Sequence, residues 1–66
     1  MKLYDCLRNS WVKPIEDTTA PPGARPVEIN EPVKFHHIDG MYSYCQDKQG
    51  NVVHLPAWTE VEYVSQ

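Results

Sequence analysis

Apolar and polar residues alternate along short stretches of this chain. The stretch from residue 2 to 8 places Leu3, Asp5 and Leu7 on one face and Tyr4, Cys6 and Arg8 on the other. A period of two is typical of a half-buried strand, whereas an amphipathic helix repeats its apolar residues at i, i+3, i+4 and i+7. No segment of ten or more residues has that helical spacing, and six prolines divide the chain further. The pattern therefore predicts an all-β fold with almost no helix.

Turn signals separate the predicted strands. The pattern predicts strands at residues 2–8, 33–38, 41–46, 52–55 and 60–64, with a short extended run at 11–13 after the first, and turns at 9–10, 39–40, 49–51 and 56–58. Asp39-Gly40 is a dipeptide favoured in two-residue type I′ hairpins, so we expect Ile38 and Met41 to pair across that turn. Pro56 cannot donate to a central ladder and should end its strand. These signals predict five strands joined mostly by tight hairpins.

Residues 16–26 interrupt the alternating pattern with a long loop. The segment includes three prolines and no large apolar side chain that could anchor a core. Prolines favour an extended, stiffened backbone. We therefore expect this loop to project from the sheet as an arm.

The chain is short for a domain that folds without help. A domain of this size buries only about 60% of the surface that its unfolded chain exposes, and a flat five-stranded sheet would leave one face wet and both edges open. Curling of the sheet into a small, partly open barrel would solve both problems. We therefore expect residues 1–66 to form a single β-barrel domain. A deep catalytic cleft would remove core volume that such a domain needs, so no enzymatic activity is expected.

Several short motifs resemble those of SH3 domains. They are Leu3-Tyr4-Asp5, the long proline-containing early loop, Asp39-Gly40-Met41-Tyr42, Gly50 before a strand, and Leu55-Pro56 ahead of Tyr63-Val64. In that family the matching elements are an Ala-Leu-Tyr-Asp-Tyr first strand, an Asp-Gly-Trp-Trp segment, a glycine-rich hairpin and a late 3₁₀ turn. The resemblance implies a five-stranded SH3-like barrel. Met41 and Cys6 stand where the family has a groove tryptophan and a tyrosine, so the resemblance supports the topology more than recognition of proline-rich ligands.

The same resemblance implies a cluster of large side chains on one side of the barrel. Its members are Tyr4, Met41, Tyr42, Pro56, Trp58 and Tyr63. An aromatic groove of this kind can dock a preformed polyproline II segment. The alternative is that Tyr42, Trp58 and Tyr63 fill the core or its rim, because the chain has only seven aromatic residues with which to build one. The burial of Trp58 distinguishes the two interpretations.

Charge narrows the range of partners. The chain has six Lys/Arg and nine Asp/Glu, a formal net charge of −3 and a pI near 5.4. Its cations are scattered singly, which argues against nucleic acid as a partner bound through its phosphates. There is neither a signal-like N-terminal segment nor an apolar stretch of about 20 residues that could span a bilayer. We therefore expect a cytoplasmic protein with no membrane partner.

The cysteine and histidine residues are candidates for metal ligands or for a nucleophile and its base. Thiolate and imidazole are the ligands that zinc prefers, but Cys6, His36, His37, Cys45 and His54 contain no C-x₂-C or H-x₃₋₅-H pair. Adjacent His36 and His37 should point to opposite faces of their strand. Cys45 and His54 could lie opposite each other as the one candidate nucleophile and base. Two cysteines are also too few for a disulfide scaffold, so free thiols are favoured over a bridge. We expect no metal and no cofactor.

Together these observations favour a small, non-catalytic module that binds another protein. Its binding surface would be formed by the early loop and the Asp39-Gly40 hairpin. Its size is typical of the accessory proteins with which phages and mobile elements bind one host protein. A second hypothesis is a nucleic-acid-binding barrel that stacks bases on aromatic side chains, and a zinc protein or an enzyme is the third. Salt dependence of binding distinguishes the first two, because contacts to phosphates weaken as salt rises.

Overall fold

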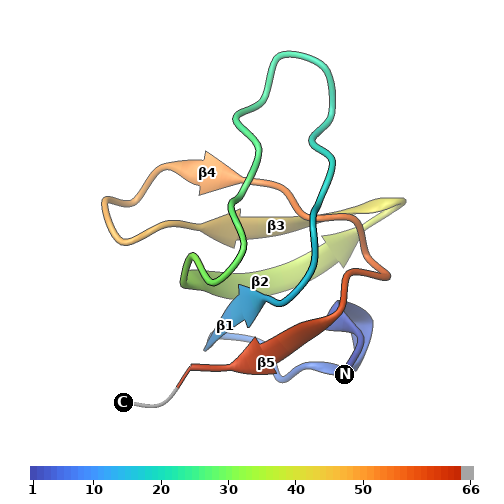
Figure 1. Ribbon diagram of the computed structural model, residues 1–66, viewed down its shortest axis with the longest axis vertical. Coiled ribbons are helices and arrows are strands. Elements are labelled where there is room, and N and C mark those ends of the chain that lie inside the picture. Colours follow the sequence, from blue (N-terminus) through green and yellow to red (C-terminus); the bar gives the residue numbers. More distant parts are fainter. Residues whose placement is uncertain (65–66) are drawn as a thin grey trace.

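A computed structural model describes residues 1–64 of the chain and shows one antiparallel sheet of five strands. The elements are a 3₁₀ turn, η1 (Leu3–Asp5), and the strands β1 (Ser10–Pro14), β2 (Val33–Asp39), β3 (Tyr42–Gln46), β4 (Val52–Val53) and β5 (Val61–Tyr63). Their order across the sheet is β4-β3-β2-β1-β5 (Figure 1). The sheet curls without closing, so the predicted all-β, partly open barrel is confirmed. The predicted domain extends to residues 65 and 66, which lie outside the described residues.

The core lies on the inner face of the curled sheet. In β2, Val33 and Phe35 are buried while Lys34 between them faces outward, as the period of two requires. The buried apolar residues are Leu3, Cys6, Val12, Val27, Val33, Phe35, Cys45, Val53, Leu55 and Val61. Four of them come from outside the strands: Leu3 and Cys6 from η1 and the residue after it, Val27 from the long loop, and Leu55 from the segment after β4. These segments therefore complete a core that the sheet alone does not cover.

Residues 2–8 do not form the predicted strand. The backbone N–H groups of Asp5 and Cys6 donate to the carbonyl oxygens of Lys2 and Leu3, which makes the 3₁₀ turn η1. Leu3 and Cys6 are buried three residues apart, whereas Leu7 is exposed. A single 3₁₀ turn satisfies that spacing and strict alternation does not. The first strand of the sheet is therefore β1, which extends the predicted run at 11–13.

The β2–β3 hairpin turns one residue later than predicted. Asp39 pairs with Tyr42 and Ile38 pairs with Ser43, so the central residues are Gly40 and Met41, and the predicted pairing of Ile38 with Met41 is wrong. Gly40 has a φ of +68° and Met41 lies outside the positive region, which is the type II′ pattern with glycine at the first central position. Burial decides this register, because Ile38 packs on the core and Ser43 is buried.

A β-bulge interrupts β2 at His36. Phe35 pairs with Cys45 and His37 pairs with Tyr44, so His36 is the additional residue on its strand. The rings of both histidines lie next to Tyr44, with centroid distances of 5.6 Å for His36 and 5.4 Å for His37. The prediction that these neighbours point to opposite faces is therefore wrong. The bulge places both imidazoles on the outer face of the sheet.

The long loop between β1 and β2 projects from the sheet (Figure 1). Its two arms are joined where the Thr18 hydroxyl donates to the carbonyl oxygen of Val27 at 2.9 Å. Near its base, the Asn30 N–H donates to the carbonyl oxygen of Pro14 at 2.8 Å. These contacts hold the loop as an ordered arm, which agrees with the stiffness expected from its prolines.

Candidate functional site

Three separate segments of the chain meet at Ala57. The Tyr4 N–H donates to the carbonyl oxygen of Ala57 at 3.1 Å, and the Ala57 N–H donates to the carbonyl oxygen of Met41 at 2.9 Å. Trp58 is the next residue after Ala57. Two backbone hydrogen bonds therefore hold η1, the β2–β3 hairpin and the turn after β4 at one place on the molecule.

The large side chains at this junction face solvent. Tyr4 is 55% exposed, Met41 66% and Trp58 49%. We refer to these three residues as the turn surface. Exposure of Trp58 excludes the interpretation in which its ring fills the core. A group of exposed large apolar side chains is typical of sites where a protein contacts another molecule.

The other three residues of the predicted cluster lie elsewhere or are covered. Tyr42 pairs with Asp39 and lies on the outer face of the sheet, while Pro56 is buried and forms a bridge with Tyr42. The Tyr63 hydroxyl accepts a hydrogen bond from the Leu7 N–H at 3.0 Å, beyond the far end of η1. The structure therefore brings together Tyr4, Met41 and Trp58 but not a single groove of six side chains.

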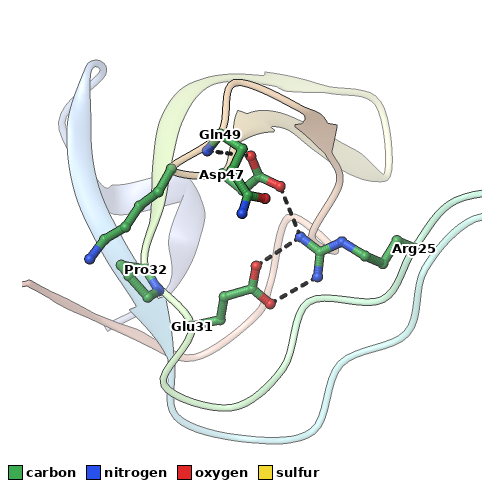
Figure 2. A pocket seen from close by; sticks show the side chains of 6 residues that line it. Arg25, Glu31, Pro32, Asp47 and Gln49 are labelled. Atoms are coloured by element: carbon green, nitrogen blue, oxygen red, sulfur yellow. Dashed lines mark hydrogen bonds and ion pairs between the residues drawn. The ribbon is translucent and has the colours of Figure 1, made fainter.

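A network of charged side chains fastens the long loop to the β3–β4 turn. The Arg25 guanidinium donates to both carboxylate oxygens of Glu31, at 3.0 and 2.7 Å, and to Asp47 at 3.3 Å (Figure 2). A pocket of about 310 Å³ lies beside it and is lined by Arg25, Glu31, Pro32, Asp47, Lys48 and Gln49. The carboxylates occupy the donor groups of Arg25, so we interpret this network as a latch for the loop.

The latch holds the long loop at a distance from the β2–β3 hairpin. Asp47 directly follows β3, whereas Met41 directly precedes it. Arg25 therefore fastens the loop at the opposite end of β3 from the turn surface. The structure does not support the expectation that the early loop and this hairpin form a common surface.

Asp47 is the anchor of this latch. Burial by itself would raise the pKa of its carboxyl, but the donors around it have the larger combined effect and lower that pKa. These donors are the N–H groups of Gln49 and Asn51, both at 2.9 Å, the Asn51 side-chain amide at 3.2 Å, and Arg25. The Arg25 guanidinium likewise lowers the pKa of Glu31. Both carboxylates are thus stabilised in their ionised form.

Acidification is expected to weaken the fold through this latch. Each carboxyl has a lower pKa in the folded state than its ordinary value, 4.5 for Glu31 and 3.8 for Asp47. Their contribution is therefore complete above those values and is lost as the pH falls through the folded pKa values. Urea denaturation between pH 7 and pH 2 should show this loss, and Glu31→Gln should make it smaller. A loss that is the same size in Glu31→Gln and in the control Asp17→Asn would contradict the latch.

The cysteines and histidines are on opposite faces of the sheet. Cys6 and Cys45 are buried free thiols, and burial raises the pKa of both. His54 instead donates to the carbonyl oxygen of Ser43 and packs edge-on against Tyr44, with 6.3 Å between ring centroids. Cys45 and His54 therefore do not form a nucleophile and base. Within residues 1–64, no three His, Cys, Asp or Glu side chains are grouped so that they could hold a metal ion.

Sequence reasoning missed a cluster of three imidazoles around Tyr44. His37 stacks on the Tyr44 ring with an interplanar angle of 6°, and His36 and His54 meet it at 67° and 78°. His36 also donates to the Gln46 side-chain oxygen at 2.8 Å. The signal for this cluster is the His-His pair, which regular alternation would have divided between two faces. Only the bulge places both rings on one side.

Comparisons with known protein families, with curated proteins and with solved structures find no match for this chain. Over residues 1–64, no helix is long and apolar enough to cross a membrane. A function for the chain therefore rests on the surfaces that its own residues build.

Proposed function

We propose that this protein is a small, non-catalytic interaction module of the cytoplasm that binds another protein through the turn surface. The observation that carries this proposal is the joint exposure of Tyr4, Met41 and Trp58 around Ala57. Aromatic residues and methionine are enriched at protein interfaces, and methionine adapts its shape to an apolar partner. The backbone bonds to Ala57 hold these residues in place before binding, which reduces the entropic cost of association.

We also propose that the barrel is SH3-like. The long loop between β1 and β2 and the turn that begins at Pro56 support this assignment. The position of Tyr63 away from the turn surface favours an apolar contact patch over a groove for a proline-rich peptide. The partner in this proposal is therefore a folded protein with an apolar patch, such as the single host protein that a phage accessory protein binds.

Trp58→Ala is expected to separate binding from stability. Because the ring is about half exposed, its removal should lower the free energy of unfolding by only about 1 kcal/mol or less. Met41→Asp places a charge on the same surface and should abolish capture of the partner. The measurement is affinity capture from bacterial lysate with the wild-type chain and both variants, together with thermal unfolding of each.

A matched control is Ile29→Asp, which introduces the same charge at an exposed apolar residue of the long loop. A partner held by the wild-type chain and by Ile29→Asp, and lost from Met41→Asp, would support the turn surface. Equal capture by Met41→Asp, or the lack of any stoichiometric partner, would refute it.

A further inference from the structure

The outer face of the sheet gathers the chain's imidazoles with two lysines and two aromatic rings. We define the outer sheet face by Trp11 and Lys13 of β1, Lys34, His36 and His37 of β2, Tyr44 of β3, and His54 after β4. Cross-strand pairing places Trp11 next to Lys34. This face lies on the other side of the sheet from the core and contains none of the three residues of the turn surface.

The outer sheet face carries two lysines and two carboxylates, so it is close to neutral although the whole chain is acidic. Lys13 and Lys34 form no ion pair within residues 1–64, where the paired side-chain cations are Lys2 and Arg25, and both of these lie elsewhere. The carboxylates nearest to this face stand at its margins, with Asp39 at the end of β2 and Glu62 of β5 opposite Lys13. The net charge of −3 therefore does not describe this surface.

The aromatic and imidazole rings on the outer sheet face are arranged so that a further planar ring can stack on them. His37 and Tyr44 are nearly parallel, and His37 is exposed, so a further planar ring can stack on it. His36 and His54 meet the Tyr44 ring at its edges and are fixed by their hydrogen bonds to Gln46 and to the Ser43 carbonyl oxygen. The stacking platform therefore exists before any ligand arrives.

We propose that the outer sheet face binds single-stranded nucleic acid. Bases would stack on the His37–Tyr44 pair and on Trp11, while Lys13 and Lys34 lie close to the phosphates. Stacked aromatic rings bordered by cations are the general means by which proteins bind single strands. This activity is additional to the protein contact proposed for the turn surface, and it uses different residues.

The test is fluorescence anisotropy with a labelled ten-nucleotide oligothymidylate in 50 mM salt. The wild-type chain should bind the oligonucleotide, and binding should weaken as salt rises. Lys34→Gln should reduce the slope of log affinity against log salt by about 0.7, because one phosphate contact is lost. Lys48→Gln, which removes a cation from the β3–β4 turn, should leave the slope unchanged.

His37→Ala isolates the stacking contribution. It should weaken binding about fivefold or more at pH 8, while thermal unfolding confirms that the variant is folded. Trp58→Ala on the turn surface should bind the oligonucleotide as the wild-type chain does. The experiment therefore distinguishes a failure of this proposal from a failure of the proposed protein contact. No binding in 50 mM salt, an equal effect of Lys48→Gln and Lys34→Gln, or equal affinity for a polyglutamate peptide would overturn the proposal.

Discussion

Phe35→Ala is expected to lower the free energy of unfolding by about 3–5 kcal/mol. Phe35 is 2% exposed and is the one phenylalanine of the chain. It lies in the middle of β2, where it pairs with Ser10 on one side and with Cys45 on the other. Its removal would leave a cavity in the centre of a small core. Urea denaturation followed by circular dichroism measures the change.

This loss is large compared with the stability of the whole domain. Native domains are stable by only about 5–15 kcal/mol, and the smallest ones bury the least surface. Phe35→Ala should therefore be largely unfolded near 37 °C, whereas Phe35→Leu retains most of the buried volume and should stay folded. A loss below about 1 kcal/mol for Phe35→Ala would show that Phe35 is not part of the core.

Ser43→Ala should lower the free energy of unfolding, because Ser43 is a buried polar residue with hydrogen bonds in the core. The Ser43 hydroxyl is buried, where it donates to the carbonyl oxygen of Leu55 at 2.9 Å and accepts from the Leu55 N–H at 3.2 Å. Alanine would leave that N–H buried without a partner, while the Leu55 carbonyl oxygen would still accept from the Ser43 backbone. An unpaired buried donor costs about 1–3 kcal/mol, which urea denaturation can measure.

A comparison with Ser10→Ala isolates the effect of burial. The Ser10 hydroxyl donates to the carbonyl oxygen of Leu7, but this bond is exposed to water. Solvent can replace the lost partner there, so Ser10→Ala should change stability by less than about 0.5 kcal/mol. Equal losses in the two variants would contradict the role assigned to the Ser43 hydroxyl.

The region from residue 33 to 64 was largely predictable from the sequence. Its strands are short runs of β-branched and aromatic residues, and Gly40, Gly50 and Pro56 mark their ends. Gly40 and Gly50 both have positive φ angles, which glycine adopts at little cost. Local turn chemistry therefore predicts these elements well, as it does the projecting loop at 16–26.

The errors arose where contacts distant in sequence decide the local structure. Residues 2–8 alternate like a strand, yet Leu3 and Cys6 both pack into the core, and the chain turns to place them there. The register of the β2–β3 hairpin follows the burial of Ser43, which is polar and gives no apolar signal. The contact between Arg25 and Asp47 spans 22 residues and has no local motif.

The structure brings together only part of the predicted cluster. The resemblance to SH3 domains implied that Tyr4, Met41 and Trp58 lie together, and the backbone bonds to Ala57 bring them together. Tyr42 was assigned to that cluster by the same resemblance. With the observed register Met41 occupies the turn, and Tyr42 begins the strand on the outer face.

Because of the bulge at His36, the two faces of β2 carry different numbers of side chains. On the core side Val33, Phe35 and Ile38 remain available for packing, while the opposite side carries one residue more than a regular strand allows. Deletion of His36 would restore regular pairing and keep the same apolar residues inside. A single inserted residue thus adds a functional side chain to the solvent-facing side of this strand and removes none from its core-facing side.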